Sequence, residues 1–159
     1  MAATRSDLHD LNVERVSSSY AAATSSIGAQ SSASERHAEM LGLDSESTLR
    51  SIASSTDPDG TIHTRYQQYF RGVPVWGEHV VVAEDSKGNL RSLFGRSVGG
   101  LAAEIPVRAP LIGAANALNA AKIAALGNLR SAMRTENESS RQMIYVDDND
   151  VAHMAYVVN

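Results

Sequence analysis

The chain has 159 residues, of which 43% are hydrophobic and 20% are charged, and its formal net charge is −4. These values are typical of a globular protein with one medium domain or two small ones. The sequence contains no cysteine, which excludes disulfides, thiolate metal sites and cysteine catalysis. It has no run of Lys and Arg that would favour a nucleic-acid or anionic-membrane partner, and no apolar run long enough to span a bilayer.

The N-terminal part of the chain is poor in large apolar residues. Residues 1–16 lack the apolar segment of a signal peptide, so we expect the signal of an exported protein to lie outside this sequence. Residues 6–16 are apolar enough for a short strand or turn. Residues 17–34 offer only Tyr20 and Ile27 for burial, which favours a loop or linker; the alternative is an extended arm held against a partner.

A short helix and a four-stranded meander are expected next. Ser34 as the cap, Glu35 in the first turn and Gly42 after the last turn predict the helix. Residues 48–98 predict four antiparallel strands, because apolar and polar residues alternate between the turn sequences DPDG, RG and DSKGN. In the third strand, Pro74 lies at the start, and Gly77 predicts a bulge or a close approach of another backbone.

The C-terminal part predicts a linker, a helix and a hairpin. Residues 99–110 contain two glycines and two prolines and are interpreted as the linker. Pro110 and Gly127 mark the start and the end of the helix, and residues 131–140 predict a polar loop. The hairpin is expected to have strands 143–146 and 151–158 around a turn at 147–150. One face of the helix is formed by Leu111, Ala114, Leu118, Ala121 and Ala125. Grouped strands with separate helices favour an α+β fold.

No catalytic, cofactor or metal site is predicted. The five His residues include no pair three or four positions apart, which the HExxH helix of a zinc hydrolase requires. The acidic turn of Asp147, Asp148 and Asp150 lacks the Gly and the Glu of an EF-hand calcium loop, so a polar hairpin turn is the better interpretation. His63 and His79 lie among polar neighbours and are interpreted as ordinary strand residues.

The stretch RYQQYFRGVPVWGEHVVV, which begins at Arg65, resembles the core of the fungalysin/thermolysin propeptide domain. The matching features are Arg65, the two glutamines that follow Tyr66, the GVPV segment, Gly77 and the later DSKGNLRSLFG. The second unit, with MIYVDDNDVAHMAYVVN, resembles the start of a PepSY domain. This order is similar to that of the propeptides of thermolysin-type zinc metalloproteases, of the vibriolysin and pseudolysin branch.

The resemblance implies two small cystatin-like units, each an antiparallel sheet with a packed helix. The propeptide-type unit would cover residues 35–98 and the PepSY-type unit residues 111–159, with an arm at 1–34 and a linker at 99–110. The closing segment of the PepSY-type unit is expected outside this sequence. The implied function is that of an intramolecular chaperone and inhibitor, which stays noncovalently bound to a secreted protease domain after autoprocessing. The resemblance implies zinc and calcium in that partner domain, and no cofactor in this chain.

A stand-alone periplasmic or secreted inhibitor or adaptor module is the alternative function. Under both hypotheses the polar stripe of the meander is a binding surface or a folding core. Arg65 could equally pair with a local carboxylate, and Trp76 could serve the core or an interface. Tyr156 lies in an apolar strand whose edge we expect another segment to cover. The candidate residues are Arg65, Gln67, Tyr69, Pro74, Trp76, Gly77 and Tyr156.

Overall fold

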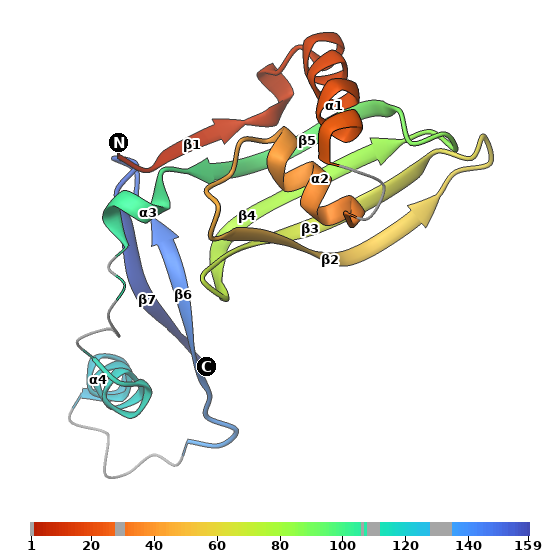
Figure 1. Ribbon diagram of the computed structural model, residues 1–159. Helices are drawn as coiled ribbons and strands as arrows, with labels where there is room; N and C mark the ends of the chain where they lie inside the picture. The colour runs from red at the N-terminus through yellow and green to blue at the C-terminus, as the bar shows by residue number, and fades with distance from the viewer. Residues whose placement is uncertain (1, 28–30, 106, 108–111, 128–134) are drawn as a thin grey trace.

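A computed structural model describes residues 2–27, 31–105, 107, 112–127 and 135–159. The fold is α+β, as predicted, with seven strands in the order β1-β5-β4-β3-β2 and a hairpin, β6–β7, that pairs with β4 through β6 (Figure 1). The elements are β1 (Thr4–Asp7), η1 (Leu8–Asp10), α1 (Val13–Ile27), α2 (Ala33–Met40), β2 (Ser47–Thr56), β3 (Ile62–Phe70), β4 (Val73–Glu84), β5 (Leu90–Gly99), α3 (Leu101–Glu104), α4 (Ala114–Leu126), β6 (Ser140–Val146) and β7 (Ala152–Val158). None of the described helices has the length and apolar character needed to cross a membrane.

The predicted meander is confirmed as strands β2 to β5, and three of the hairpin turns in the fold are built alike. In each turn the first residue is an Asp whose carbonyl accepts a hydrogen bond from the residue three positions later, which has a positive φ. The side chain six positions after the Asp then pairs with its carboxylate. The pairs are Asp57 with His63 (2.9 Å), Asp85 with Arg91 (3.7 Å) and Asp147 with His153 (3.1 Å). A shared turn of this kind fixes the register of each hairpin.

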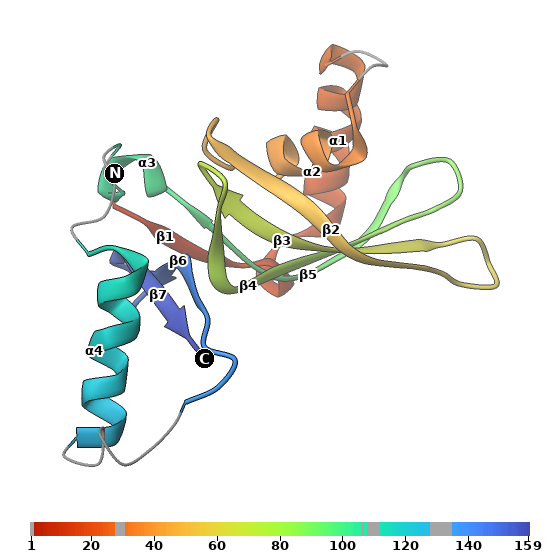
Figure 2. The same cartoon turned by 90° about the horizontal axis from the view of Figure 1, so that it is seen from below.

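Helices α1 and α2 cover one face of the meander and leave the other without a helix among the described elements (Figure 2). The apolar side chains between helices and sheet form a core of Leu8, Tyr20, Leu49, Tyr66, Val80, Val82, Leu90 and Leu93. A buried polar contact adds to it: His37 Nδ1 of α2 lies 2.9 Å from the Tyr66 hydroxyl, and His37 Nε2 lies 3.1 Å from a carboxylate oxygen of Glu84. The packed face of β3 is therefore the one that carries Tyr66.

The interpretation of residues 17–34 as a loop is wrong for residues 17–27, which belong to α1. This helix already begins at Val13, so the short strand or turn expected at 6–16 is wrong for residues 13–16. Asn12 caps this helix by accepting a hydrogen bond from the backbone N–H of Arg15 (3.1 Å). The serine hydroxyls find acceptors inside the helix, since Ser18 donates to the Glu14 carbonyl (2.9 Å) and Ser19 to the Arg15 carbonyl (3.1 Å). Ala is the best helix former, so small residues make a helix here once Tyr20 anchors it in the core. Residues 28–30 lie outside the described residues.

Helix α2 begins two residues earlier than predicted. Ser32, and not Ser34, is its cap: the Ser32 hydroxyl accepts from the Glu35 N–H, and the Glu35 carboxylate accepts from the Ser32 N–H, which together form a capping box. Gly42 follows the helix with a φ of +64°, as its predicted role as the stop signal requires.

The linker expected at residues 99–110 is wrong for residues 99–105. This segment ends β5 and forms α3, and Leu101 and Ile105 are buried. They join a second core with residues from the start of the chain, from the end of β3, from β4 and β5 and from the C-terminal hairpin, namely Ala3, Phe70, Val75, Val98, Ile144, Val146 and Ala152. Burial of the apolar residues after Gly99 and Gly100 therefore determines the structure of this segment, although its glycines and prolines favour a linker. Pro110, Leu111 and residues 131–134 lie outside the described residues.

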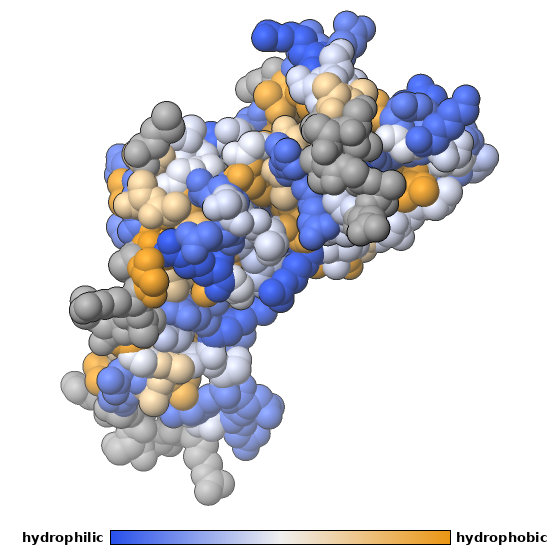
Figure 3. Space-filling view, in the orientation of Figure 1, coloured by the Kyte–Doolittle hydropathy of each residue, from blue (hydrophilic) through white to orange (hydrophobic). Residues whose placement is uncertain are grey.

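The helix and hairpin at the C-terminal end are confirmed as α4, β6 and β7. The predicted start of the helix at Pro110 is wrong, because Gly113 is extended and the helix begins at Ala114; β6 begins at Ser140, earlier than the predicted residue 143. The expected buried face of α4 is only partly covered, because Leu118 and Ala121 are half-buried while Ala114 and Ala125 are exposed. Strand β6 reaches the meander through one parallel bridge, between Val75 and Ile144. The face drawn in Figure 3 shows hydrophobic side chains as separate patches between hydrophilic ones. The division into two cystatin-like units stays a prediction.

Candidate functional site: a bulge and the hollow beside it

Strand β4 contains a bulge around Gly77, as the sequence predicted. Four residues of β4, Val75–Glu78, lie opposite a single residue of β3, Gln68. Gly77 has a φ of +74°, a conformation that favours glycine. Val75 and Glu78 are both buried, whereas Trp76 between them is 47% exposed. The bulge therefore turns Trp76 outward and Glu78 inward.

Gln67 completes the hydrogen bonding of this bulge. Its side-chain Nε2 donates to the carbonyl oxygens of Val75 (2.7 Å) and Glu78 (3.2 Å). Both carbonyls belong to the segment where β4 has lost its backbone pairing with β3. The amide of Gln67 thus gives these two carbonyls a partner on β3 where the backbone pairing of β3 with β4 is interrupted. Its role in this structure is to hold the bulge in place.

The side chain of Gln68 bonds the backbone of β5 on the buried side of the sheet. Its Nε2 donates to the Val98 carbonyl (2.7 Å) and its Oε1 accepts from the Val98 N–H (2.9 Å). The amide side chain is fully buried. The backbone pairing of β4 with β5 extends no further than Val80 and Gly95, so Gln68 bridges β3 and β5 where β4 has turned away.

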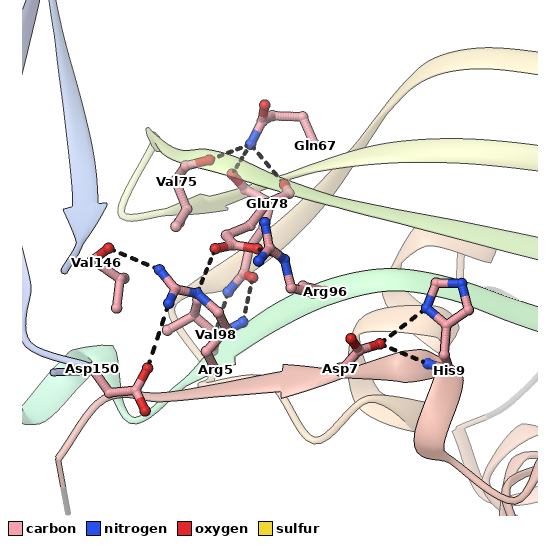
Figure 4. A network of polar contacts seen from close by, with 11 residues as sticks. Arg5, Asp7, His9, Gln67, Val75, Glu78, Arg96, Val98, Val146 and Asp150 are labelled. Carbon is pink, nitrogen blue, oxygen red and sulfur yellow. Dashed lines mark hydrogen bonds and ion pairs between the residues drawn. The ribbon is translucent and has the colours of Figure 1, made fainter. Parts of the chain in front are cut away.

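Glu78 is a buried carboxylate held by two arginines (Figure 4). Its oxygens lie 2.8 Å from Arg5 Nε and 3.3 Å from Arg96 Nε. Arg5 also donates to the Val146 carbonyl of β6 (2.8 Å) and lies 3.7 Å from Asp150. A buried charge is tolerated only when it is paired. This network therefore fastens β1, β4, β5 and the C-terminal hairpin to one another behind the bulge.

A hollow of about 400 Å³ lies beside the bulge. The strand residues that line it alternate with the buried Tyr66, Gln68 and Phe70, so the hollow opens on the face of β3 away from α1 and α2. Its lining consists of Gln67, Tyr69, Pro74, Trp76, Gly77, His79, Arg141 and Met143. It therefore joins the candidate residues of β3 and β4 to two residues of β6.

The electrostatic character of this hollow is basic. Arg50 of β2 lies over the ring of Tyr69, 4.1 Å from its centroid, in a cation–π contact. Burial, and after it the positive charge of Arg65, lowers the pKa of His79 below its ordinary value. Neutral His79 contributes no charge above that pKa, so the arginines supply the positive charge around the hollow.

The structure brings five of the seven candidate residues together in this hollow: Gln67, Tyr69, Pro74, Trp76 and Gly77. Arg65 lies two positions before Gln67 on the same face of β3 and is exposed. Tyr156 is not part of the group, because it pairs with Gln142, whose side chain lies on the opposite face of β6 from Arg141 and Met143. Sequence patterns did not identify Arg141 or Met143, since the proximity of β6 to the bulge depends on a bridge between distant segments. They did not identify Arg50 either, since its contact with Tyr69 depends on the register of β2 against β3.

The acidic turn of the C-terminal hairpin uses its carboxylates for backbone contacts. Asp147 Oδ1 accepts from the N–H groups of Asn149 and Val151, both at 2.9 Å. Within the described part of the chain, no three His, Asp or Glu side chains are grouped so that they could hold a metal ion.

Known proteins are similar to this chain over the meander and beyond it. The family described as Fungalysin/Thermolysin Propeptide Motif matches residues 47–97, which cover β2 to β5 almost completely. Three Vibrio proteins are relatives: the hemagglutinin/proteinase of Vibrio cholerae (36% identical), the neutral protease of Vibrio proteolyticus (31%) and the virulence metalloprotease of Vibrio anguillarum (30%). The alignments cover 64%, 64% and 68% of this chain but only 17%, 17% and 18% of those proteins.

Proposed function

Because the meander carries the fungalysin/thermolysin propeptide motif and the chain is similar to Vibrio metalloproteases over a small part of their length, we propose that this chain is the propeptide region of a secreted zinc metalloendopeptidase of the thermolysin type. The match of the motif to β2–β5 carries the proposal. In this proposal the catalytic groups belong to the protease domain. The protease domain would bind zinc and calcium. The precursor would be exported through the periplasm.

The propeptide acts on its protease domain as an intramolecular chaperone and, after autoprocessing, as a noncovalent inhibitor. The hollow beside the bulge supports this role, since it presents Trp76 and Tyr69 together with arginines. Trp, Tyr and Arg are the residues that most often dominate the energy of protein interfaces. With Trp76 exposed and Tyr69 half-buried, this group suits recognition of another protein surface better than chemistry on a small substrate.

Two activity measurements test this function. The protease domain is produced without its propeptide and refolded with and without this chain, and peptide hydrolysis reports the yield of active enzyme. The folded chain is then titrated against the mature protease. We expect a higher yield in the first experiment and inhibition at submicromolar concentration in the second. A folded chain that does neither at micromolar concentration contradicts the proposal.

The alternative, a stand-alone inhibitor or adaptor, is separated from this function by the refolding experiment. A stand-alone inhibitor would slow the mature protease without raising the yield of refolded enzyme. A matched control is Phe70→Asp, which places a carboxylate in the core at a fully buried position and so removes the folded propeptide from the reaction. The same reading frame should also encode an HExxH-bearing protease domain downstream.

We further propose that α4, β6 and β7 form a PepSY-type unit, with residues 35–98 as the propeptide-type unit. Among the described strands, β7 pairs only with β6, so its outer edge offers unpaired backbone groups to a further strand. A strand of the same precursor would cover this edge. Tyr156→Asp places a charge in β7 and should lower the affinity for the protease domain, whereas Ser31→Asp in the α1–α2 connection should not.

A further inference from the structure

Three arginines lie at or beside the hollow: Arg141 lines it, Arg50 stacks on the lining Tyr69, and Arg65 lies two positions before the lining Gln67. Arg50 lies on β2, Arg65 on β3 and Arg141 on β6, and all three are exposed. Among the described residues none of them has a carboxylate oxygen within 4.0 Å, whereas Arg5, Arg71, Arg91 and Arg96 each have one. A chain with a net charge of −4 thus gathers unpaired positive charge at one place on its surface.

The arginines lie next to the most exposed aromatic side chain of the bulge. Trp76 is 47% exposed and lines the hollow with Tyr69, over which the Arg50 guanidinium is stacked. Gln67 and Gly77 fix the backbone that presents Trp76. The backbone of the bulge is therefore held in place before any partner arrives, which lowers the entropy lost on binding.

The chemistry of this surface determines what can cover it. A partner that buries Trp76 also removes water from the neighbouring guanidinium groups, and a buried unpaired charge opposes binding. The partner must therefore supply carboxylates opposite Arg50, Arg65 and Arg141, where charge-assisted and bidentate hydrogen bonds are available. An apolar or basic partner surface does not meet this requirement.

We propose that the hollow beside the bulge, with Arg50, Arg65 and Arg141 at its rim, docks an acidic surface of the protease domain that presents Asp and Glu side chains around an apolar contact for Trp76. This inference rests on the proposed function and adds to it the place and the charge of the contact. Complementary charge of this kind speeds association and becomes weaker as salt rises.

Charge reversal tests the proposal. The double variant Arg65→Glu/Arg141→Glu is compared with the matched control Arg15→Glu/Lys87→Glu, which makes the same change in charge at exposed positions of α1 and of the β4–β5 turn. Association and dissociation rates with the separately produced mature protease domain are measured at about 0.05 M and about 0.5 M salt. We expect the double variant to raise Kd at least ~10-fold at low salt, mainly through slower association, and the control to change Kd less than ~3-fold.

Two further variants keep the test informative. Arg65→Lys/Arg141→Lys retains the charge and should retain most of the association rate, while Arg65→Gln/Arg141→Gln should fall between wild type and the reversal. Circular dichroism and thermal unfolding of each variant show whether it is folded. If wild type binds and the folded Arg65→Glu/Arg141→Glu and Arg65→Gln/Arg141→Gln variants behave like the control, the acidic docking surface is refuted while the propeptide function stands. If folded wild type does not bind the protease at all, the propeptide function fails and this inference fails with it.

Discussion

Two adjacent glutamines illustrate how single residues hold this fold together. The side chains of Gln67 and Gln68 point to opposite faces of β3, and each takes the place of missing backbone pairing, one toward β4 and the other toward Val98 of β5. Sequence alone placed Gln67 among the candidate binding residues, but its contacts show that it also shapes the site from within. The alternation of β3 predicted which way each glutamine points; it could not predict that β4 bends away and leaves acceptors for them.

Removing the buried amide should destabilise the protein strongly. Gln68→Leu keeps the size of the side chain but leaves the N–H and the carbonyl of Val98 without partners in a buried place. We expect the free energy of unfolding in urea to fall by about 3 kcal/mol. The matched control is Gln142→Leu, because the buried Nε2 of Gln142 has no hydrogen-bond partner among the described residues. Equal losses for the two variants would contradict this account of Gln68.

The carboxylate of Glu104 should make stability depend on pH. Hydrogen bonds from the backbone N–H groups of Ala152 and Ala3 hold the pKa of Glu104 below its ordinary value of 4.5. The folded state therefore favours the ionised form, and this stabilisation is complete above pH 4.5 and is lost as the pH falls through the lowered pKa. Glu104→Gln should unfold more easily than wild type near neutral pH, and the difference should shrink toward about pH 3. Urea unfolding across this range measures it, with exposed Glu136→Gln as the control that changes little.

Among the elements, the meander was predictable and the N-terminal helix was not. Each meander strand is bounded by a turn sequence with a Gly or Asp at a fixed place, and the alternation between turns leaves one solution. Helix α1 has no comparable apolar stripe: Tyr20 is its buried core residue, and Val13 and Val16 are only partly buried against the same core. Exposed serine hydroxyls bond back to the helix backbone. The composition of residues 17–27 favours a loop, but packing against β5 stabilises them as a helix. The expected linker was wrong for the same reason, because burial of Leu101 and Ile105 in the core orders residues 99–105.

Strand β5 should tolerate no side chain at the position where it crosses β4. A Cβ built on Gly95 would lie 2.0 Å from the His79 carbonyl oxygen, and Gly95 has a φ of +96°. Gly95→Ala must shift one backbone against the other, and we expect a loss of at least about 3 kcal/mol in the free energy of unfolding. Gly42→Ala is the matched control: its φ is +64° but nothing lies within 4 Å of the added Cβ, so we expect about 1 kcal/mol. Thermal and urea unfolding of both variants decide the comparison.

At the scale of the whole molecule, the N-terminal strand connects the meander to the C-terminal hairpin. Arg5 joins Glu78 of β4 to Val146 of β6, and Glu104 of α3 joins Ala3 to Ala152. These contacts unite segments from both ends of the chain and from its middle. Local sequence patterns predicted each segment separately, but the pairing of charges across them has no local signal, and neither has the hollow that Arg141 helps to form.

Loss of Arg5 should loosen the hairpin before it affects the meander. Arg5→Ala leaves the buried Glu78 with only Arg96 as a partner and removes the donor to Val146. We expect a loss of about 3 kcal/mol in the free energy of unfolding and faster hydrogen exchange in β6 and β7 than in β2 and β3. Arg91→Ala is the control, since Arg91 forms only an exposed pair with Asp85 at 3.7 Å and should change stability by less than about 0.5 kcal/mol. Uniform exchange throughout the sheet in Arg5→Ala would show that the two parts unfold as one.

The single bridge between Val75 and Ile144 also sets an order of events during synthesis. All four strands of the meander leave the ribosome before β6 exists, and their hairpins can form by local contacts. Until the hairpin arrives, the nascent chain leaves the apolar surface around Phe70, Val75 and Leu101 uncovered. Closing the loop between Val75 and Ile144 is then the last and slowest step. A ribosome stalled after α3 would carry a chain whose meander is folded but whose uncovered apolar surface is prone to aggregate.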